Sequence, residues 1–420
     1  MTRSAAGSLT RTSGRFAKGL RGADAYELFD GYCQRLVIHG APLWRANAAM
    51  ETLHPQWNGY GYLWRRDLNA IEPEQYPHRD ENELIWATSP FYALVERARA
   101  GESNPSMRRR IEARPEERDF PVLEEFFGLG ATDYVAYLFV YGKDGERGKD
   151  GDRSQGTGIV YSFAADRKGG FSDDDLTLLQ ATLPALSLAM KAHAGHVIAA
   201  GLLETYLGED AGRRVHAGSI MRGSGDKLNA VIWYADIRGF TPISDSAPGP
   251  VVVELLNEMF EVLTASLRPH GGQVLKFIGD ECLPFSRSTS TTGRRPAGTR
   301  STPRSRRRAP SRGSPRRAGA AGLPAASVDL ALHLGEVLYG NVGATDRLDF
   351  TVIGPAVNEA ARIEALCEPL GRPVLVSAEF AAGIAGVESR LFSLGRHTLR
   401  GVRETKEIFA LDLGGSGRDR

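Results

Sequence analysis

Two apolar runs in the second half of the chain each lead to a carboxylate at a turn. Residues 230–235 form a continuous apolar run, typical of a buried strand, and Asp236 follows it. Residues 273–278 form a second run, and Gly279 and Asp280 after it indicate a tight turn. Between the runs, helical spacing links Val252, Leu255, Leu256, Met259, Phe260, Leu263 and Leu267. We expect Asp236 and Asp280 to meet if the two strands are neighbours.

The first half of the chain has a different pattern. Helical apolar spacing predicts a helix over residues 23–38, and apolar, aromatic-rich runs predict strands over 133–141 and 158–163. Ser172 is a predicted N-cap, and the three aspartates after it favour the positive end of a helix dipole. A long helix is therefore expected to start here and to end at the glycine-containing stretch 208–212.

These patterns divide the 420 residues into four parts. We expect a disordered basic tail over residues 1–22, an α+β domain that ends in a linker helix over 23–205, a linker over 206–228, and a second α+β domain over 229–415.

Composition limits the class of protein. The three cysteines lie far apart and fit no metal or disulfide spacing, which favours reduced thiols. No apolar run reaches the roughly 18 residues of a membrane span, because residues 176–203 are interrupted by Lys191, His193 and His196. The N-terminus lacks the apolar region of a secretory signal. We expect a cytoplasmic protein without a membrane span.

The formal net charge of +1 hides an uneven distribution, because residues 287–317 carry eleven arginines and no acid. Without them, 41 basic side chains face 51 acidic ones. The rest of the chain is therefore acidic, and nucleic acid is not an expected partner. The surrounding segment 286–326 is rich in Arg, Ser and Pro, cannot form a buried amphipathic helix, and is expected to be disordered.

The end of the first domain resembles the C-terminal half of a GAF domain. The resemblance consists of the two strands, the Gly-, Asp- and Lys-rich loop between them, and Phe171-Ser172-Asp173-Asp174-Asp175 at the start of the long helix. It implies a sensor module that binds an unknown small ligand or protein and dimerises through its last helix. The alternative is an unrelated α+β domain.

The second domain carries four motifs in order: Ala235-Asp236-Ile237-Arg238-Gly239-Phe240-Thr241, Lys276-Phe277-Ile278-Gly279-Asp280, Gly340-Asn341-Val342-Gly343, and Phe350-Thr351-Val352-Ile353-Gly354 leading to Val357-Asn358-Glu359-Ala360-Ala361-Arg362. Together they resemble the catalytic domain of class III nucleotide cyclases, the family of adenylyl and guanylyl cyclases. The resemblance implies an α+β, ferredoxin-like βαββαβ fold that converts a nucleoside triphosphate into a cyclic nucleotide and pyrophosphate.

The same resemblance implies a metal and phosphate site. Asp236 and Asp280, with the Ile237 carbonyl, would hold two Mg²⁺ or Mn²⁺ ions, which would activate the ribose 3′-hydroxyl and neutralise the triphosphate. Phe240 and Thr241 begin the next helix, where backbone amides can meet phosphate oxygens.

Two side chains are expected to select the base. The Lys276 ammonium can donate a hydrogen bond to N1 of adenine, whereas N1 of guanine is itself a donor. Thr351 lies where many relatives have aspartate, and its hydroxyl can accept from the adenine 6-amino group. ATP is therefore favoured over GTP.

Asn358 and Arg362 lie four residues apart, on one face of the expected helix. In the family they would orient the ribose and stabilise the transition state, and Arg400 would contact phosphate. The family forms its pocket between two catalytic domains. Because this chain carries both halves, the resemblance implies a homodimer with two sites at the interface.

Segment 286–326 stands where the family has an Ala-rich helix. We consider three explanations: compensating frame shifts in a GC-rich gene, a true disordered insert, or a segment that binds nucleic acid or acidic lipid. The leading functional hypothesis is an adenylate cyclase regulated by its N-terminal domain. The alternatives are a guanylate cyclase and a non-catalytic, nucleotide-binding regulatory dimer.

Overall fold

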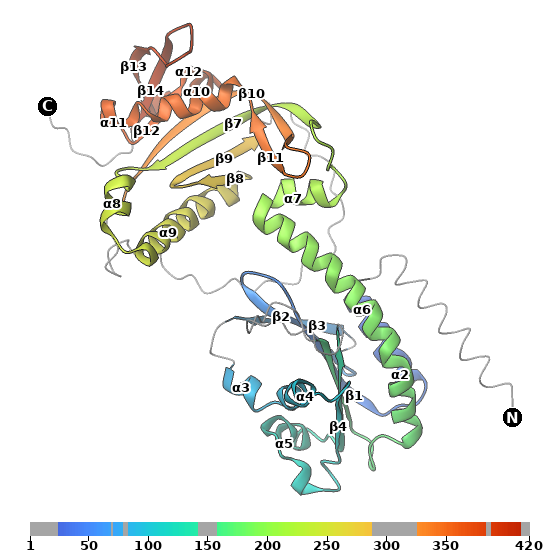
Figure 1. Ribbon diagram of the computed structural model, residues 1–420. Coiled ribbons are helices and arrows are strands. Elements are labelled where there is room, and N and C mark those ends of the chain that lie inside the picture. Colours follow the sequence, from blue (N-terminus) through green and yellow to red (C-terminus); the bar gives the residue numbers. More distant parts are fainter. Residues whose placement is uncertain are drawn as a thin grey trace. The chain divides into compact units, whose positions relative to one another are not determined.

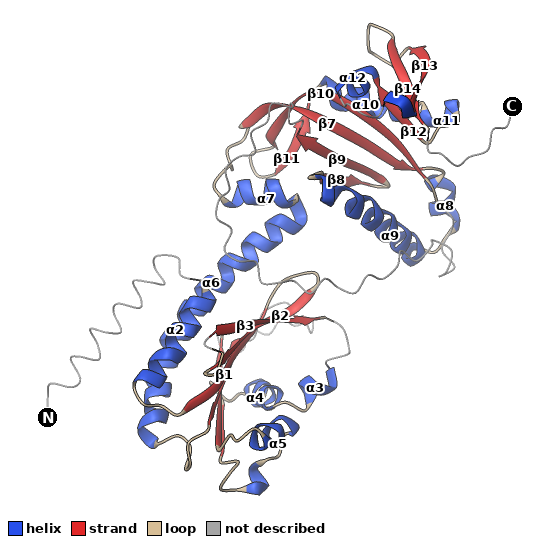
Figure 2. Cartoon of the chain, turned by 180° about the vertical axis from the view of Figure 1, so that it is seen from behind, coloured by secondary structure: helices blue, strands red, loops and turns tan. Residues whose placement is uncertain are grey.

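The computed structural model describes residues 24–68, 70–78, 83–141, 158–287, 326–383 and 388–412. The chain divides between Leu202 and Leu203 into two units, each with its own sheet and core (Figures 1 and 2). Both units mix helices and strands, so the predicted α+β class is confirmed.

The described part of the first unit forms a six-stranded sheet in which every pair of neighbours is antiparallel. The strand order is β3-β2-β1-β6-β5-β4. The strands are β1 (Leu43–Glu51), β2 (Trp57–Arg65), β3 (Ala70–Pro77), β4 (Ser106–Arg109), β5 (Asp133–Val140) and β6 (Gly158–Ala165). The two predicted strands are β5 and β6. Strand β6 is at the centre of this sheet, and β5 lies between β6 and the edge strand β4.

Helices cover both faces of this sheet. On one face α2 (Ala25–Ile38) and α6 (Asp173–Leu207) pack through Phe29, Leu179 and Leu183. On the other face α4 (Pro90–Arg99) and α5 (Pro121–Gly128) pack through Leu94 and Leu123. Figure 1 shows the two layers on opposite sides of the strands. The remaining helices are short: α3 (Glu83–Ala87) and the 3-10 turn η2 (Pro115–Glu117).

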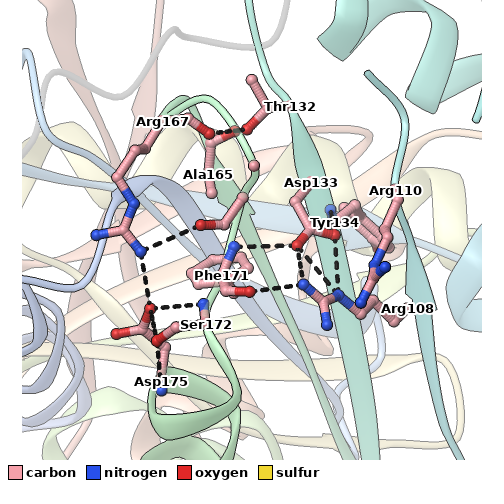
Figure 3. Close-up of polar contacts among 12 residues, drawn as sticks. Arg108, Arg110, Thr132, Asp133, Tyr134, Ala165, Arg167, Phe171, Ser172 and Asp175 are labelled. Atoms are coloured by element: carbon pink, nitrogen blue, oxygen red, sulfur yellow. Dashed lines mark hydrogen bonds and ion pairs between the residues drawn. The ribbon is translucent and has the colours of Figure 1, made fainter. Parts of the chain in front are cut away.

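A buried carboxylate fastens the start of α6 to the sheet (Figure 3). Asp133 is 1% exposed and accepts hydrogen bonds from Arg108 Nη2 (2.7 Å) and from the Phe171 amide (3.0 Å). Arg108 Nη2 also donates to the Phe171 carbonyl (2.6 Å). Gly170 has a positive φ of +72°, and a Cβ there would lie 2.3 Å from the Asp133 carboxylate. We call this arrangement the Asp133 clamp.

Helix α6 begins where the sequence predicts. The Ser172 hydroxyl accepts from the Asp175 amide (3.2 Å), and the Asp175 carboxylate accepts from the Ser172 amide (2.8 Å), which satisfies groups that a helix start leaves unpaired. By length and composition α6 is long and apolar enough to cross a membrane, which we did not expect of residues 176–203. One such helix is weak evidence for a membrane span. Leu179, Leu183 and Met190 of this helix are buried in the core of the first unit.

The described part of the second unit forms an eight-stranded sheet in the order β13-β14-β12-β10-β7-β9-β8, with β11 paired to β10. Among the strand pairs that the structure describes in this sheet, β10 and β12 are parallel and the others are antiparallel. The strands are β7 (Gly225–Ile237), β8 (Gln273–Ile278), β9 (Glu281–Arg287), β10 (Val328–Gly343), β11 (Leu348–Ile353), β12 (Val374–Ser377), β13 (Leu391–His397) and β14 (Lys406–Leu411).

Helix α10 (Pro355–Glu364) lies on this sheet through Ala356, Ala360 and Ile363, spaced as one helical face. The other helical elements are α7 (Glu209–His216), α8 (Phe240–Ser246), α9 (Gly249–Leu267), η3 (Arg268–His270), α11 (Cys367–Leu370), α12 (Ala378–Gly383) and η4 (Glu388–Arg390). Ala211 of α7 is buried in the same core, so residues assigned to a linker by their pattern here belong to the second unit.

Candidate functional site

The predicted carboxylate pair is assembled by three neighbouring strands. Asp236 lies near the end of β7, which pairs with β9, and Asp280 occupies the turn that joins β8 to β9. The Asp236 and Asp280 carboxyls are neighbours. Burial, hydrogen bonding to Asp280 and the negative charge of Asp280 together raise the pKa of Asp236 to about 7. The two acids therefore meet as expected. Because both are carboxyls, neither compensates the negative charge of the other.

More acids surround this pair. Glu281 accepts a hydrogen bond from the Tyr234 hydroxyl (2.6 Å). Burial and the nearby charge of Asp236 raise the pKa of Glu364, at the end of α10, to about 7. Sequence reasoning missed both residues, although Glu281 directly follows Asp280. A further acid, Asp329, is neutralised by Arg238, whose Nε lies 2.9 Å from its carboxylate.

The oxygen donors fit a divalent cation. Among the residues that the structure describes, no group of three or more His, Cys, Asp or Glu side chains is arranged to hold a metal ion. Asp236 and Asp280 supply two carboxylates, and hard oxygen donors of this kind suit Mg²⁺ or Mn²⁺, which also draw ligands from water and substrate phosphates. A bound cation would offset the negative charge of Asp280, which together with the larger effect of burial raises the pKa of Asp236.

Lys276 lies on β8 next to an irregularity in the pairing of β8 with β9. The register shifts between Val274 and Lys276, and Pro284 is the partner of Val274. A proline has no amide hydrogen to donate, and a bulge of this kind redirects the next side chain. The Lys276 ammonium forms an ion pair with Asp349 of β11.

Thr351, the predicted partner of Lys276, also lies on β11 and is 9% exposed. It is two residues from Asp349, so both side chains are on the same face of the strand. The structure therefore brings Lys276 to the strand that carries Thr351, but its ion pair is with Asp349. Sequence reasoning missed Asp349, and the motif gives no signal for it.

The remaining candidates lie on α10 and in nearby turns. Asn358 is exposed, while Arg362 is half-buried one turn further along. A Cβ at Gly401 would lie 3.6 Å from Arg362 Nη2, so the exposed Arg400 lies in a turn beside Arg362. These residues form a second group, separate in the sequence from Asp236 and Asp280.

Phe240 and Thr241 are the first residues of α8, after Gly239 in the left-handed conformation (φ 70°). No side-chain capping bond is made at this helix start, because its N-cap residue is a glycine. Segment 286–326, whose disorder was expected, lies outside the described residues except for positions 286, 287 and 326.

Comparisons with known proteins give partial matches. No family model matches the chain. An uncharacterized protein of Mycobacterium tuberculosis (strain H37Rv) is 33% identical over 198 residues, covering 46% of this chain and 35% of that protein. A second uncharacterized protein of that strain is 32% identical over 200 residues, covering 46% of this chain and 34% of that protein. The matches thus span about a third of the length of these relatives.

Among solved structures, a bacterial light-regulated adenylyl cyclase is similar with a TM-score of 0.41 and 18% identity, over 61% of this chain and 83% of that chain. The adenylyl cyclase CyaB from P. aeruginosa gives 0.35 and 21%, over 47% and 99%. The guanylyl cyclase Cya2 gives 0.33 and 21%, over 44% and 93%.

Proposed function

We propose that this protein is an adenylate cyclase that converts ATP into 3′,5′-cyclic AMP and pyrophosphate. The observation that carries the proposal is the contact between Asp236 and Asp280, two carboxylates brought together at half-buried positions by β7 and the β8–β9 turn. Two ionised carboxylates in contact destabilise a fold unless one of them is protonated or a cation is bound between them. The four motifs in family order add the chemical identity of the site.

Each group of residues has a role in this reaction. Asp236 and Asp280 would hold two Mg²⁺ or Mn²⁺ ions, with the Ile237 carbonyl as a further ligand. Bound ions of this kind supply charge that favours ionisation of the ribose 3′-hydroxyl and neutralises the pyrophosphate. Asn358 orients the ribose, and Arg362 and Arg400 place positive charge where negative charge develops on the phosphates. The Phe240 and Thr241 amides donate to phosphate oxygens.

The active site is shared between two copies of the chain. The carboxylates come from one copy, and Lys276, Thr351, Asn358 and Arg362 come from the other. Large apolar side chains that are exposed on the second unit support a covering partner. They are Phe277 and Ile278 on β8, Leu338 and Val342 on β10, and Leu348 and Ile353 on β11.

The first unit is proposed to regulate this activity by binding a small ligand or a protein. The Asp133 clamp supports such a role because it makes the start of α6 part of the folded first unit. A ligand that binds one conformational state of the first unit better than another would shift the equilibrium between these states. A guanylate cyclase, or a nucleotide-binding dimer without turnover, remains the alternative.

The shared site is tested by mixing two inactive variants. Asp236→Ala and Asn358→Ala should each abolish cyclic AMP formation from ATP with Mg²⁺ or Mn²⁺. A heterodimer of the two should regain one intact site of its two, measured as cyclic AMP after co-expression with different affinity tags and tandem purification. No recovery in verified heterodimers would refute the shared site.

The same assay separates the alternatives. Wild-type protein that makes cyclic GMP from GTP in preference is a guanylate cyclase. Wild-type protein that binds ATP without turnover is a regulatory dimer. Protein that neither binds nor converts either nucleotide contradicts the proposal.

A further inference from the structure

We propose that Asp349 is a positioning residue that determines the choice of base by holding Lys276 in place. The inference rests on the proposed function, in which Lys276 reads the base of the bound nucleotide. Its structural basis is the ion pair between the Lys276 ammonium on β8 and the Asp349 carboxylate on β11.

The ion pair joins strands that do not pair with each other. β8 pairs with β9, and β11 pairs with β10, yet β8 and β11 are in contact, as Figures 1 and 2 show near the β8–β9 edge. The Lys276 and Asp349 side chains are 28% and 54% exposed. Ion pairs this exposed contribute little to the stability of a fold. A contribution to stability therefore does not explain the ion pair between Lys276 and Asp349.

Holding the lysine has a consequence for binding. A free lysine has a flexible four-carbon stem, and ordering it on a ligand costs free energy. Asp349 takes one of the three ammonium donors and leaves the other two available. The bulge before Lys276 and the carboxylate beyond it thus fix the ammonium before nucleotide arrives.

The fixed position discriminates between bases. Adenine presents the acceptor N1 beside a 6-amino donor, and guanine presents the acceptor O6 beside an N1–H donor. An ammonium held at the adenine N1 position faces a donor when guanine is bound. A released lysine can move to O6, so loss of Asp349 should weaken ATP binding and relax discrimination against GTP. Thr351 stays in place as the acceptor for the amino group.

The test measures binding without turnover, using 3′-deoxy-ATP and 3′-deoxy-GTP, which lack the reacting hydroxyl. In the full-length protein with Mg²⁺, Asp349→Asn should bind the ATP analogue about tenfold more weakly, the cost of ordering one long side chain on binding. Its preference for adenine should fall by at least the same factor. Asp349→Glu should retain most of both, and Asp346→Asn, an exposed acid in the same hairpin, should change neither.

Thermal unfolding of the four proteins should coincide, because the pair is exposed. Unchanged affinity and preference in Asp349→Asn would overturn the inference, and tighter ATP binding would instead mark Asp349 as an inhibitory competitor for Lys276. Wild-type protein that binds neither analogue contradicts the proposed function itself and, with it, this inference. If the wild-type protein binds the analogues but does not convert ATP, the same two affinities still test the inference.

Discussion

Asp133 in the first unit begins strand β5, and Asp236 in the second unit lies near the last residue of β7. The side chains that neighbour these two acids carry opposite charges. Asp133 faces the Arg108 guanidinium and two backbone amides, those of Tyr134 and Phe171. Asp236 faces Asp280, and its pKa is raised to about 7 by burial and that neighbour. A carboxylate surrounded by donors holds the fold together, whereas a carboxylate facing another is suited to a cation from outside.

The largest expected effect is on activity at the like-charged pair. Asp236→Asn removes one proposed metal ligand and should lower cyclic AMP formation on the order of a thousandfold, the upper end for loss of one preorganised electrostatic contact. The metal-free variant should be as stable as wild type or more stable, because one of two repelling charges is gone. Cyclic AMP yield and thermal unfolding in chelator measure the two effects.

Asp245→Asn, an exposed acid on α8, is the control and should alter neither quantity. A variant of Asp236 that is inactive because it unfolds would contradict the comparison, since Asp236 would then be structural like Asp133.

The Asp133 clamp should behave in the opposite way. Asp133→Ala removes the carboxylate that accepts from Arg108 and from the Phe171 amide, and removing one partner of a buried pair costs about 3 kcal/mol or more. Because Arg108 is 21% exposed, we expect the lower end of that range. Denaturant unfolding of the full chain, followed by amide exchange in β5 and β6, measures the loss.

The neighbouring residue Arg109 supplies the control for this variant. It pairs with Asp119, whose side chain is 42% exposed whereas that of Asp133 is 1% exposed, so Asp119→Ala should cost under about 1 kcal/mol. Equal costs at Asp119 and Asp133 would show that burial does not distinguish the two ion pairs. Gly170→Ala offers a second way to disturb the clamp, with Gly169→Ala matched in backbone conformation but free of the Asp133 contact.

The two regions also differ in how far sequence reasoning reached. The pairing of Asp236 with Asp280 could be predicted because each follows an apolar run and because each lies in one of the four motifs. The Asp133 clamp could not, since Arg108 and Phe171 lie 25 and 38 residues away and meet Asp133 only through the folded sheet. Local pattern carries no information on such distant partners.

Within the second unit the limit has the same cause. Helical periodicity located α9 and the family motif located α10, but α7 is short and Ala211 in it is buried in the core. Thr351 was expected to read the base together with Lys276, whereas the ion-pair partner of Lys276 is Asp349, reached across a contact between strands that do not pair with each other. Tertiary geometry of this kind becomes visible only once the sheet order is known.

The last expected effect is a dependence of stability on pH that belongs to the acid cluster. Asp236 and Glu364 have folded pKa values of about 7, above their usual 3.8 and 4.5. Between those limits the folded state holds protons that the unfolded state has released, so the free energy of unfolding falls as pH rises. This contribution is complete below about pH 4 and lost above about pH 7.

In chelator, the second unit should therefore become less stable between about pH 5 and pH 8, and Mn²⁺ should restore more stability at the higher pH, where the carboxylates are ionised. Amide exchange in β7 and β9 reports this unit separately from the first. Asp236→Asn should flatten both the pH dependence and the response to Mn²⁺. A slope that persists unchanged in this variant would place the titrating groups elsewhere, and the contrast with Asp133 would then rest on geometry and activity alone.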